Sequence, residues 1–84
     1  MSPKNIKTSY SVAELIEALK KYPQDLPVLV SGYEGGFENI LPPIIERLIY
    51  KPENQNWDGE FQIAEEENEA DLEAVVLRRV FRND

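Results

Sequence analysis

The sequence predicts an α+β fold in which one N-terminal helix packs on a small, mostly antiparallel sheet of three to four strands. Three observations predict it: a capped amphipathic pattern near the N-terminus, several short apolar segments after it, and turn-forming Gly and Pro residues between those segments. With 84 residues, 1–84 has the length of a single domain. One helix on one sheet is the simplest arrangement that buries such stripes.

The helix is predicted to begin at Ser11, after an arm over residues 1–9 that we expect to be flexible. Ser11 and Glu14 have the spacing of a capping box, in which each side chain accepts a hydrogen bond from the other residue's amide. Pro23 disfavours helical geometry at Tyr22, so the helix is predicted to end there. Apolar residues recur between these limits at helical spacing and predict a side that faces the core. They are Val12, Leu15, Ile16, Leu19 and Tyr22.

Four strands are predicted after the helix. They cover residues 28–30, with Ser31 closing the strand, and residues 44–50, 61–63 and 74–81. The pair Asp58-Gly59 is a strong turn signal before the third strand. Paired prolines at 42 and 43 exclude a central-strand position just before the second strand. Residues 65–77 also tolerate a helical reading, and the strand order is not determined by these patterns.

The net charge of −7 is carried entirely by the second half of the chain. Residues 52–84 hold three Arg and ten acidic residues, and the segment 58–73 holds eight acidic residues and no basic one. Because phosphate binding requires positive charge, we predict no direct contact with nucleic acid. The acidic segment, with a loop over 65–71, is interpreted as a solvated region that aids solubility. The alternative is a negative surface that faces a basic protein.

The residue types that are missing exclude several kinds of chemistry. The chain has no Cys and no His, which excludes disulfides, the usual zinc sites, a Cys nucleophile and a Ser-His-Asp triad. The acidic run 65–71 lacks the glycine and the ligand spacing of an EF-hand loop. Carboxylate pairs such as Glu34 and Glu38 would need an enclosed pocket for acid–base catalysis. We therefore predict no enzyme, no catalytic residue, no cofactor and no metal site.

The sequence also shows no pattern typical of a targeting signal. The N-terminal residues lack the apolar run of a secretory signal, and no stretch approaches the roughly 18 apolar residues of a membrane span. The sequence therefore predicts a cytoplasmic protein that does not contact a membrane.

The segment 28–37, VLVSGYEGGF, contains the candidate binding site. It holds three of the four glycines and two aromatic rings directly after a strand. The loop lacks the Lys of a phosphate-binding loop and the spacing of a dinucleotide fingerprint. Either it is a tight turn whose rings fold onto the core, or it is a contact patch for a protein; a small-ligand pocket is the third interpretation. The candidate binding residues are Gly32, Tyr33, Glu34, Gly35, Gly36 and Phe37.

Arg78, Arg79 and Arg82 form the basic cluster of the acidic half. On a strand, Arg78 and Arg79 point to opposite faces. We expect one of the three arginines to pair with the acidic segment across the sheet, and the alternative is a role in holding an anion.

Residues 10–40 resemble small uncharacterised proteins of bacteria and their phages. The shared order is a capped helix, a Pro-x-Asp connector at Pro23 to Asp25, a Val-rich strand and a Gly-rich turn, and the Tyr-Glu-Gly-Gly run from Tyr33 carries most of the specificity. The resemblance covers about a third of the chain. It implies a bacterial or phage setting and a compact α+β domain, and it implies no catalytic role.

The leading functional hypothesis is a non-enzymatic protein-interaction module that binds an unidentified protein partner through residues 32–37. One alternative is an acidic inhibitor that occupies the nucleic-acid-binding surface of a basic protein. Another is a small-ligand-binding domain at the glycine-rich loop. A homodimer that pairs through an exposed edge of the last strand, 74–81, is a further option.

Overall fold

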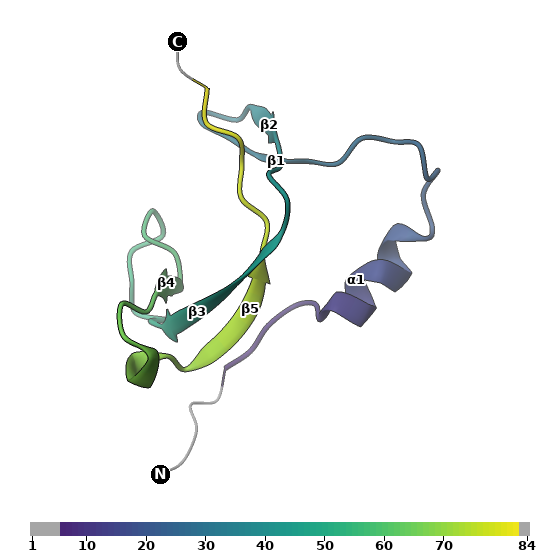
Figure 1. The fold of residues 1–84 in the computed structure, drawn as a ribbon. Helices are drawn as coiled ribbons and strands as arrows, with labels where there is room; N and C mark the ends of the chain where they lie inside the picture. The colour runs from purple at the N-terminus through teal and green to yellow at the C-terminus, as the bar shows by residue number, and fades with distance from the viewer. Residues whose placement is uncertain (1–5, 83–84) are drawn as a thin grey trace. The chain divides into compact units, whose positions relative to one another are not determined.

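The computed structural model describes residues 6–82, drawn as a coloured ribbon in Figure 1. The chain divides into two compact units. The sheet unit comprises residues 45–76 together with Ile6 and Lys7, and the hairpin unit comprises residues 8–44 and 77–82. The predicted α+β class is confirmed, with one helix near the N-terminus and antiparallel strands. The strands form two small sheets, of two and three strands, where the sequence predicted one. The assignment of residues 1–84 to one domain stays a prediction, and residues 1–5 of the predicted arm lie outside the described residues.

Helix α1 (Val12–Leu19) begins where the capping box predicts. The Glu14 N–H donates to the Ser11 hydroxyl oxygen at 3.1 Å, and the Ser11 N–H donates to the Glu14 carboxylate at 2.9 Å. The helix ends three residues before Tyr22, because the Tyr22 N–H donates to the Leu19 carbonyl in the tighter i→i+3 pattern. Within residues 6–82, no helix has the length and apolar content needed to cross a membrane.

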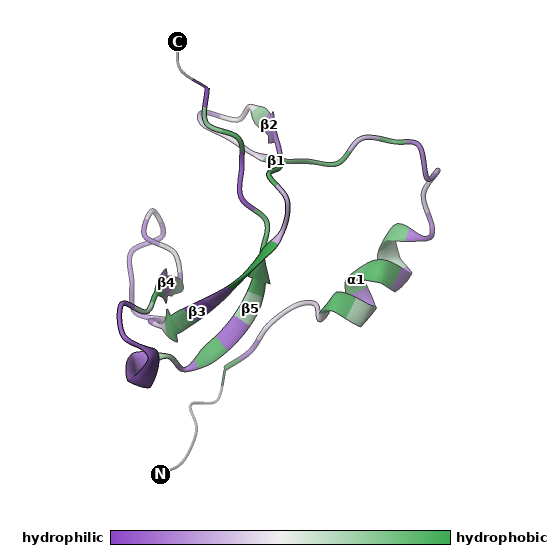
Figure 2. Cartoon of the chain, viewed as in Figure 1, coloured by the Kyte–Doolittle hydropathy of each residue, from purple (hydrophilic) through white to green (hydrophobic). Residues whose placement is uncertain are grey.

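The apolar stripe of α1 remains largely exposed. Val12, Ile16 and Leu19 are 55%, 50% and 42% exposed, and only Leu15 on the stripe is half-buried. The burial that the helical spacing predicted is therefore not found in this structure. Figure 2 shows the alternation of hydrophobic and hydrophilic residues along the helix that led to that expectation.

The capping box makes helix formation depend on pH. Hydrogen bonds from the Ser11 backbone N–H and from the Ser11 side chain lower the pKa of Glu14 below its ordinary value of 4.5. A lowered pKa stabilises the folded state above the unfolded value, and this stabilisation is lost as the pH falls through the folded pKa. We expect the Ser11 amide proton resonance to shift upfield as the pH falls below 4.5 and the capping hydrogen bond breaks. The Glu14→Gln variant should not show this pH-dependent shift of the Ser11 amide proton. If the shift in the variant is equally large, it comes from another carboxylate.

The sheet unit is built on β3 (Ile44–Tyr50), which lies between β4 (Phe61–Ile63) and β5 (Leu72–Val76) (Figure 1). In the antiparallel register, Leu48 is opposite Ile63 and Tyr50 is opposite Phe61. The two aromatic rings contact each other with their centroids 5.2 Å apart. Leu48 is the one buried hydrophobic residue among those described, at 8% exposure. The core of this unit is therefore centred on the middle of β3.

The connections in the sheet unit follow the predicted turns in part. The Asp58-Gly59 turn is confirmed, with Gly59 in a left-handed conformation (φ 75°), and β4 begins two residues later. The acidic loop contains the single 3-10 turn η1 (Glu67–Glu69), and the chain then continues as β5. Asp71 anchors the start of β5, because its N–H donates to the Leu48 carbonyl and its carboxylate accepts the Tyr50 N–H. The helical reading of residues 65–77 is therefore wrong beyond that one turn.

The hairpin unit contains β1 (Leu29–Ser31) paired with β2 (Phe37–Asn39), a strand that the sequence did not predict. Beyond β2 the chain pairs with its own C-terminal segment. The Leu41 N–H donates to the Arg78 carbonyl and the Val80 N–H donates to the Asn39 carbonyl, both at 2.8 Å. The predicted last strand, 74–81, therefore divides between β5 and this second pairing.

Candidate functional site

The glycine loop is a tight β-turn that joins β1 to β2. The Gly36 N–H donates to the Tyr33 carbonyl at 2.9 Å, and the two central residues, Glu34 and Gly35, have positive φ angles of 50° and 80°. Positive φ at both central positions defines a type I′ turn, whose twist matches that of an antiparallel hairpin. The Gly32 N–H donates to the Gly36 carbonyl at 2.8 Å and closes the loop. Tyr33 is thus held at the end of a regular ribbon.

The pairing pattern of the ribbon separates its residues into two faces. Ile40 lies directly opposite Arg79, and residues directly opposite each other in an antiparallel pair share a face. Because side chains alternate along a strand, Glu38 is on the same face as Ile40 and Arg79, whereas Phe37 is on the other face. The two rings that the sequence grouped into one patch are therefore attached to different parts of the ribbon. Tyr33 contacts the Arg79 face.

Three side chains on this face form what we call the aromatic–arginine cluster, which consists of Tyr33, Arg79 and Phe81. The Arg79 guanidinium carbon lies 4.9 Å from the centroid of the Tyr33 ring and 4.8 Å from that of Phe81. These distances are within the range of cation–π attraction. Tyr33 is 80% exposed and Phe81 is 75% exposed, while Arg79 is half-buried between segments far apart in the sequence. The cluster presents aromatic and cationic surface together.

A second contact fixes the same face of the ribbon. The Arg82 guanidinium donates from Nε and Nη2 to the Glu38 carboxylate at distances of 3.0 to 3.2 Å. The Glu38 side chain is 22% exposed, so this ion pair is partly shielded from water. This ion pair connects the C-terminal segment to β2, close to the point where Ile40 pairs with Arg79.

The acidic segment has a basic partner within its own unit. Arg47 on β3 forms ion pairs with Glu67 and with Glu73, the latter at 3.8 Å between Arg47 Nε and Glu73 Oε2. The sequence predicts this pairing with the acidic segment for one of the three C-terminal arginines instead. An open hollow of about 430 Å³ lies beside these residues. Its lining consists of Ile45, Glu46, Arg47, Ile63, Ala64, Glu65, Glu67 and Glu73.

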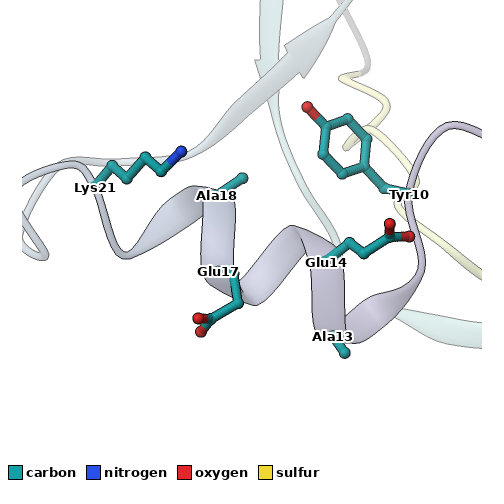
Figure 3. A pocket seen from close by; sticks show the side chains of 6 residues that line it. All are labelled: Tyr10, Ala13, Glu14, Glu17, Ala18 and Lys21. Carbon is teal, nitrogen blue, oxygen red and sulfur yellow. The ribbon is translucent and has the colours of Figure 1, made fainter.

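Another open hollow, of about 420 Å³, lies along α1 and is shown in Figure 3. Ala13 and Ala18 supply its small side chains, Tyr10 lies at one end and Lys21 at the other. Glu14 and Glu17 complete the lining. Neither this hollow nor the one beside β3 includes a residue of the glycine loop. Among residues 6–82, the structure has no group of three or more acidic side chains arranged to hold a metal ion.

The structure places the predicted binding residues in different parts of the hairpin unit. Gly32, Glu34, Gly35 and Gly36 build the turn, Tyr33 joins the aromatic–arginine cluster, and Phe37 is 68% exposed on β2. Sequence reasoning missed Phe81 as a candidate, and it treated Arg79 only as part of a charge cluster. The available signal was the alternation of Arg79 and Phe81 along the last strand, which places both on one face.

Comparisons with known proteins give no further guidance. No protein-family model matches the chain, no curated protein matches it, and no solved structure matches its fold. The resemblance of residues 10–40 to small bacterial and phage proteins therefore stays a prediction.

Proposed function

We propose that this chain is a non-enzymatic protein-interaction module that binds its partner through the aromatic–arginine cluster. One observation carries the proposal: the Tyr33 and Phe81 rings are 80% and 75% exposed, although both contact the Arg79 guanidinium. Tyr and Arg are enriched among the residues that contribute most of the binding energy in protein interfaces. A partner that covers these rings would remove apolar surface from water without first rearranging the cluster.

The surroundings of the cluster support this proposal. The type I′ turn fixes the backbone next to Tyr33, and the Glu38–Arg82 ion pair connects the residue after Phe81 to β2. Residues that are held in place before binding lose less conformational entropy when a partner binds. A cytoplasmic location, which the sequence predicts, and a bacterial or phage setting, which the resemblance of residues 10–40 implies, are part of the same proposal.

The proposal predicts which rings a partner needs. A tagged form of the chain would be used to capture proteins from a lysate of its host cell, with the bound proteins identified by mass spectrometry. The double variant Tyr33→Ala/Phe81→Ala is expected to recover at least tenfold less of the partner, because truncated hot-spot residues typically cost about 2 kcal/mol or more each. Phe37→Ala is the matched control, since it removes a ring that is also largely exposed, at 68%, from the other face of the ribbon.

Thermal unfolding of each variant should accompany the capture. A double variant that unfolds like the parent chain and still retains the partner would rule out the cluster as the interface. A partner that the double variant retains, but that is lost on neutralising the acidic residues of the 65–69 loop and at high salt, would support the acidic-inhibitor alternative. The residues to neutralise in that case are Glu65, Glu66, Glu67 and Glu69.

A further inference from the structure

Arg79 differs from the other arginines in its surroundings. Arg47 pairs with Glu67 and Glu73, and Arg82 pairs with Glu38. Within the part of the chain that the structure describes, Arg79 has two aromatic contacts and no carboxylate within ion-pair distance. Arg78 also lacks an ion pair among these residues, but no ring contacts its guanidinium.

The Arg79 side chain still has hydrogen-bond donors to offer. Its guanidinium carries five N–H donors in one plane, and among residues 6–82 it contacts the two rings without donating a hydrogen bond to a carboxylate. Two parallel N–H groups of this planar edge match the two oxygens of a carboxylate, and such bidentate pairs are among the stronger hydrogen-bonded contacts in proteins. Partial burial of Arg79 reduces the competition from water for these donors.

We propose that Arg79 binds a carboxylate side chain, of Asp or Glu, that a protein partner presents to the aromatic–arginine cluster. This inference rests on the proposed function and adds the chemistry that the partner must carry. An exposed acidic residue nearby favours a singly charged group, because Glu34 lies on the turn next to Tyr33 and would repel a doubly charged phosphate more strongly than a carboxylate. The charge of Glu38, on the same ribbon face as Arg79, is already compensated by its ion pair with Arg82.

The test uses the full chain and a defined probe. The capped peptide acetyl-Ala-Ala-Glu-Ala-Ala-amide would be titrated into ¹⁵N-labelled protein, and its Gln counterpart would serve as the uncharged control. We expect the Glu peptide to shift the Arg79 Nε–Hε resonance and the backbone amide resonances of Tyr33 and Phe81. The Gln peptide is expected to bind at least fivefold more weakly.

Two variants make the test specific for this side chain. Arg79→Lys keeps the charge but loses the planar fork, so the affinity for the Glu peptide, followed at the Tyr33 and Phe81 amides, should fall at least fivefold. Arg78→Lys is the matched control, because it makes the same substitution one residue away on the other face of the segment. Its affinity for the Glu peptide should equal that of the parent chain.

Several outcomes would overturn the inference. They are equal binding of the Glu and Gln peptides, equal loss in the two lysine variants, no shift at Arg79 at millimolar peptide, or tighter binding of inorganic phosphate than of the Glu peptide. The proposed function fails separately, through partner capture that is insensitive to Tyr33→Ala/Phe81→Ala. If a partner needs the two rings but binds Arg79→Lys normally, the proposed interface is correct and the inferred contact between Arg79 and a carboxylate is wrong.

Discussion

Leu48→Ala is expected to lower the free energy of unfolding by about 3 kcal/mol, within the range measured for deleting a buried leucine side chain. Leu48 lies on β3, the strand between β4 and β5, and is 8% exposed. The truncation would leave a cavity that three short strands are poorly able to fill. For a chain of this length, whose total stability is of order 4–13 kcal/mol, such a loss removes a large share.

The comparison residue for this prediction is Ile63, directly across the sheet from Leu48. Ile63→Ala removes a side chain of the same size, but one that is 63% exposed, so its cost should stay near 1 kcal/mol or below. Urea unfolding of both variants, followed by circular dichroism, measures the difference. Equal losses would show that the core of the sheet unit is not centred on β3.

Gly35→Val is expected to destabilise the hairpin unit by about 2 kcal/mol, because a β-branched residue strongly disfavours positive φ. Gly35 has φ 80° at the second central position of the type I′ turn. A Cβ at this position would meet no atom within 4 Å, so the cost comes from the backbone conformation and not from a steric clash with neighbours. The turn carries Tyr33, and we therefore expect the variant to weaken the contact of that ring with Arg79 as well.

Gly35→Asn separates the backbone effect from the loss of glycine itself. Asn tolerates left-handed geometry and should cost less than 1 kcal/mol at this position. Urea unfolding gives the stabilities, and the chemical shift of the Arg79 Nε–Hε group reports on the ring contact. If the Val variant is as stable as the Asn variant, residue 35 does not hold a positive φ in solution.

Local features of this chain were predictable because adjacent residues produce them. The capping box needs only Ser11 and Glu14, which contact each other within one helical turn. The Asp58-Gly59 turn and the end of β1 beside Gly32 depend on glycine's freedom to adopt positive φ or to allow close backbone approach. These signals predict the start of the helix, the end of β1 and the start of β4 to within a few residues.

The strand β2 escaped prediction because its sequence, Phe37–Asn39, contains one apolar residue and two polar ones. Its extended conformation comes from pairing with β1 on one side and from the continuation of the chain into the Ile40–Arg79 bridge. The burial of the α1 stripe was predicted from its helical spacing. The spacing of apolar residues shows that a helix is amphipathic, but it does not identify the surface against which the helix packs.

The sequence by itself determined the α+β class, the start of the helix, and the concentration of negative charge after residue 52. Only the tertiary structure decided that Tyr33 contacts Arg79 and Phe81, and that Arg47 pairs with the acidic loop. Tyr33 and Arg79 are 46 positions apart in the chain, and their contact depends on the pairing of the C-terminal segment with the chain that follows β2. Local propensity acts over a few residues, whereas this pairing reflects the free energy of the whole fold.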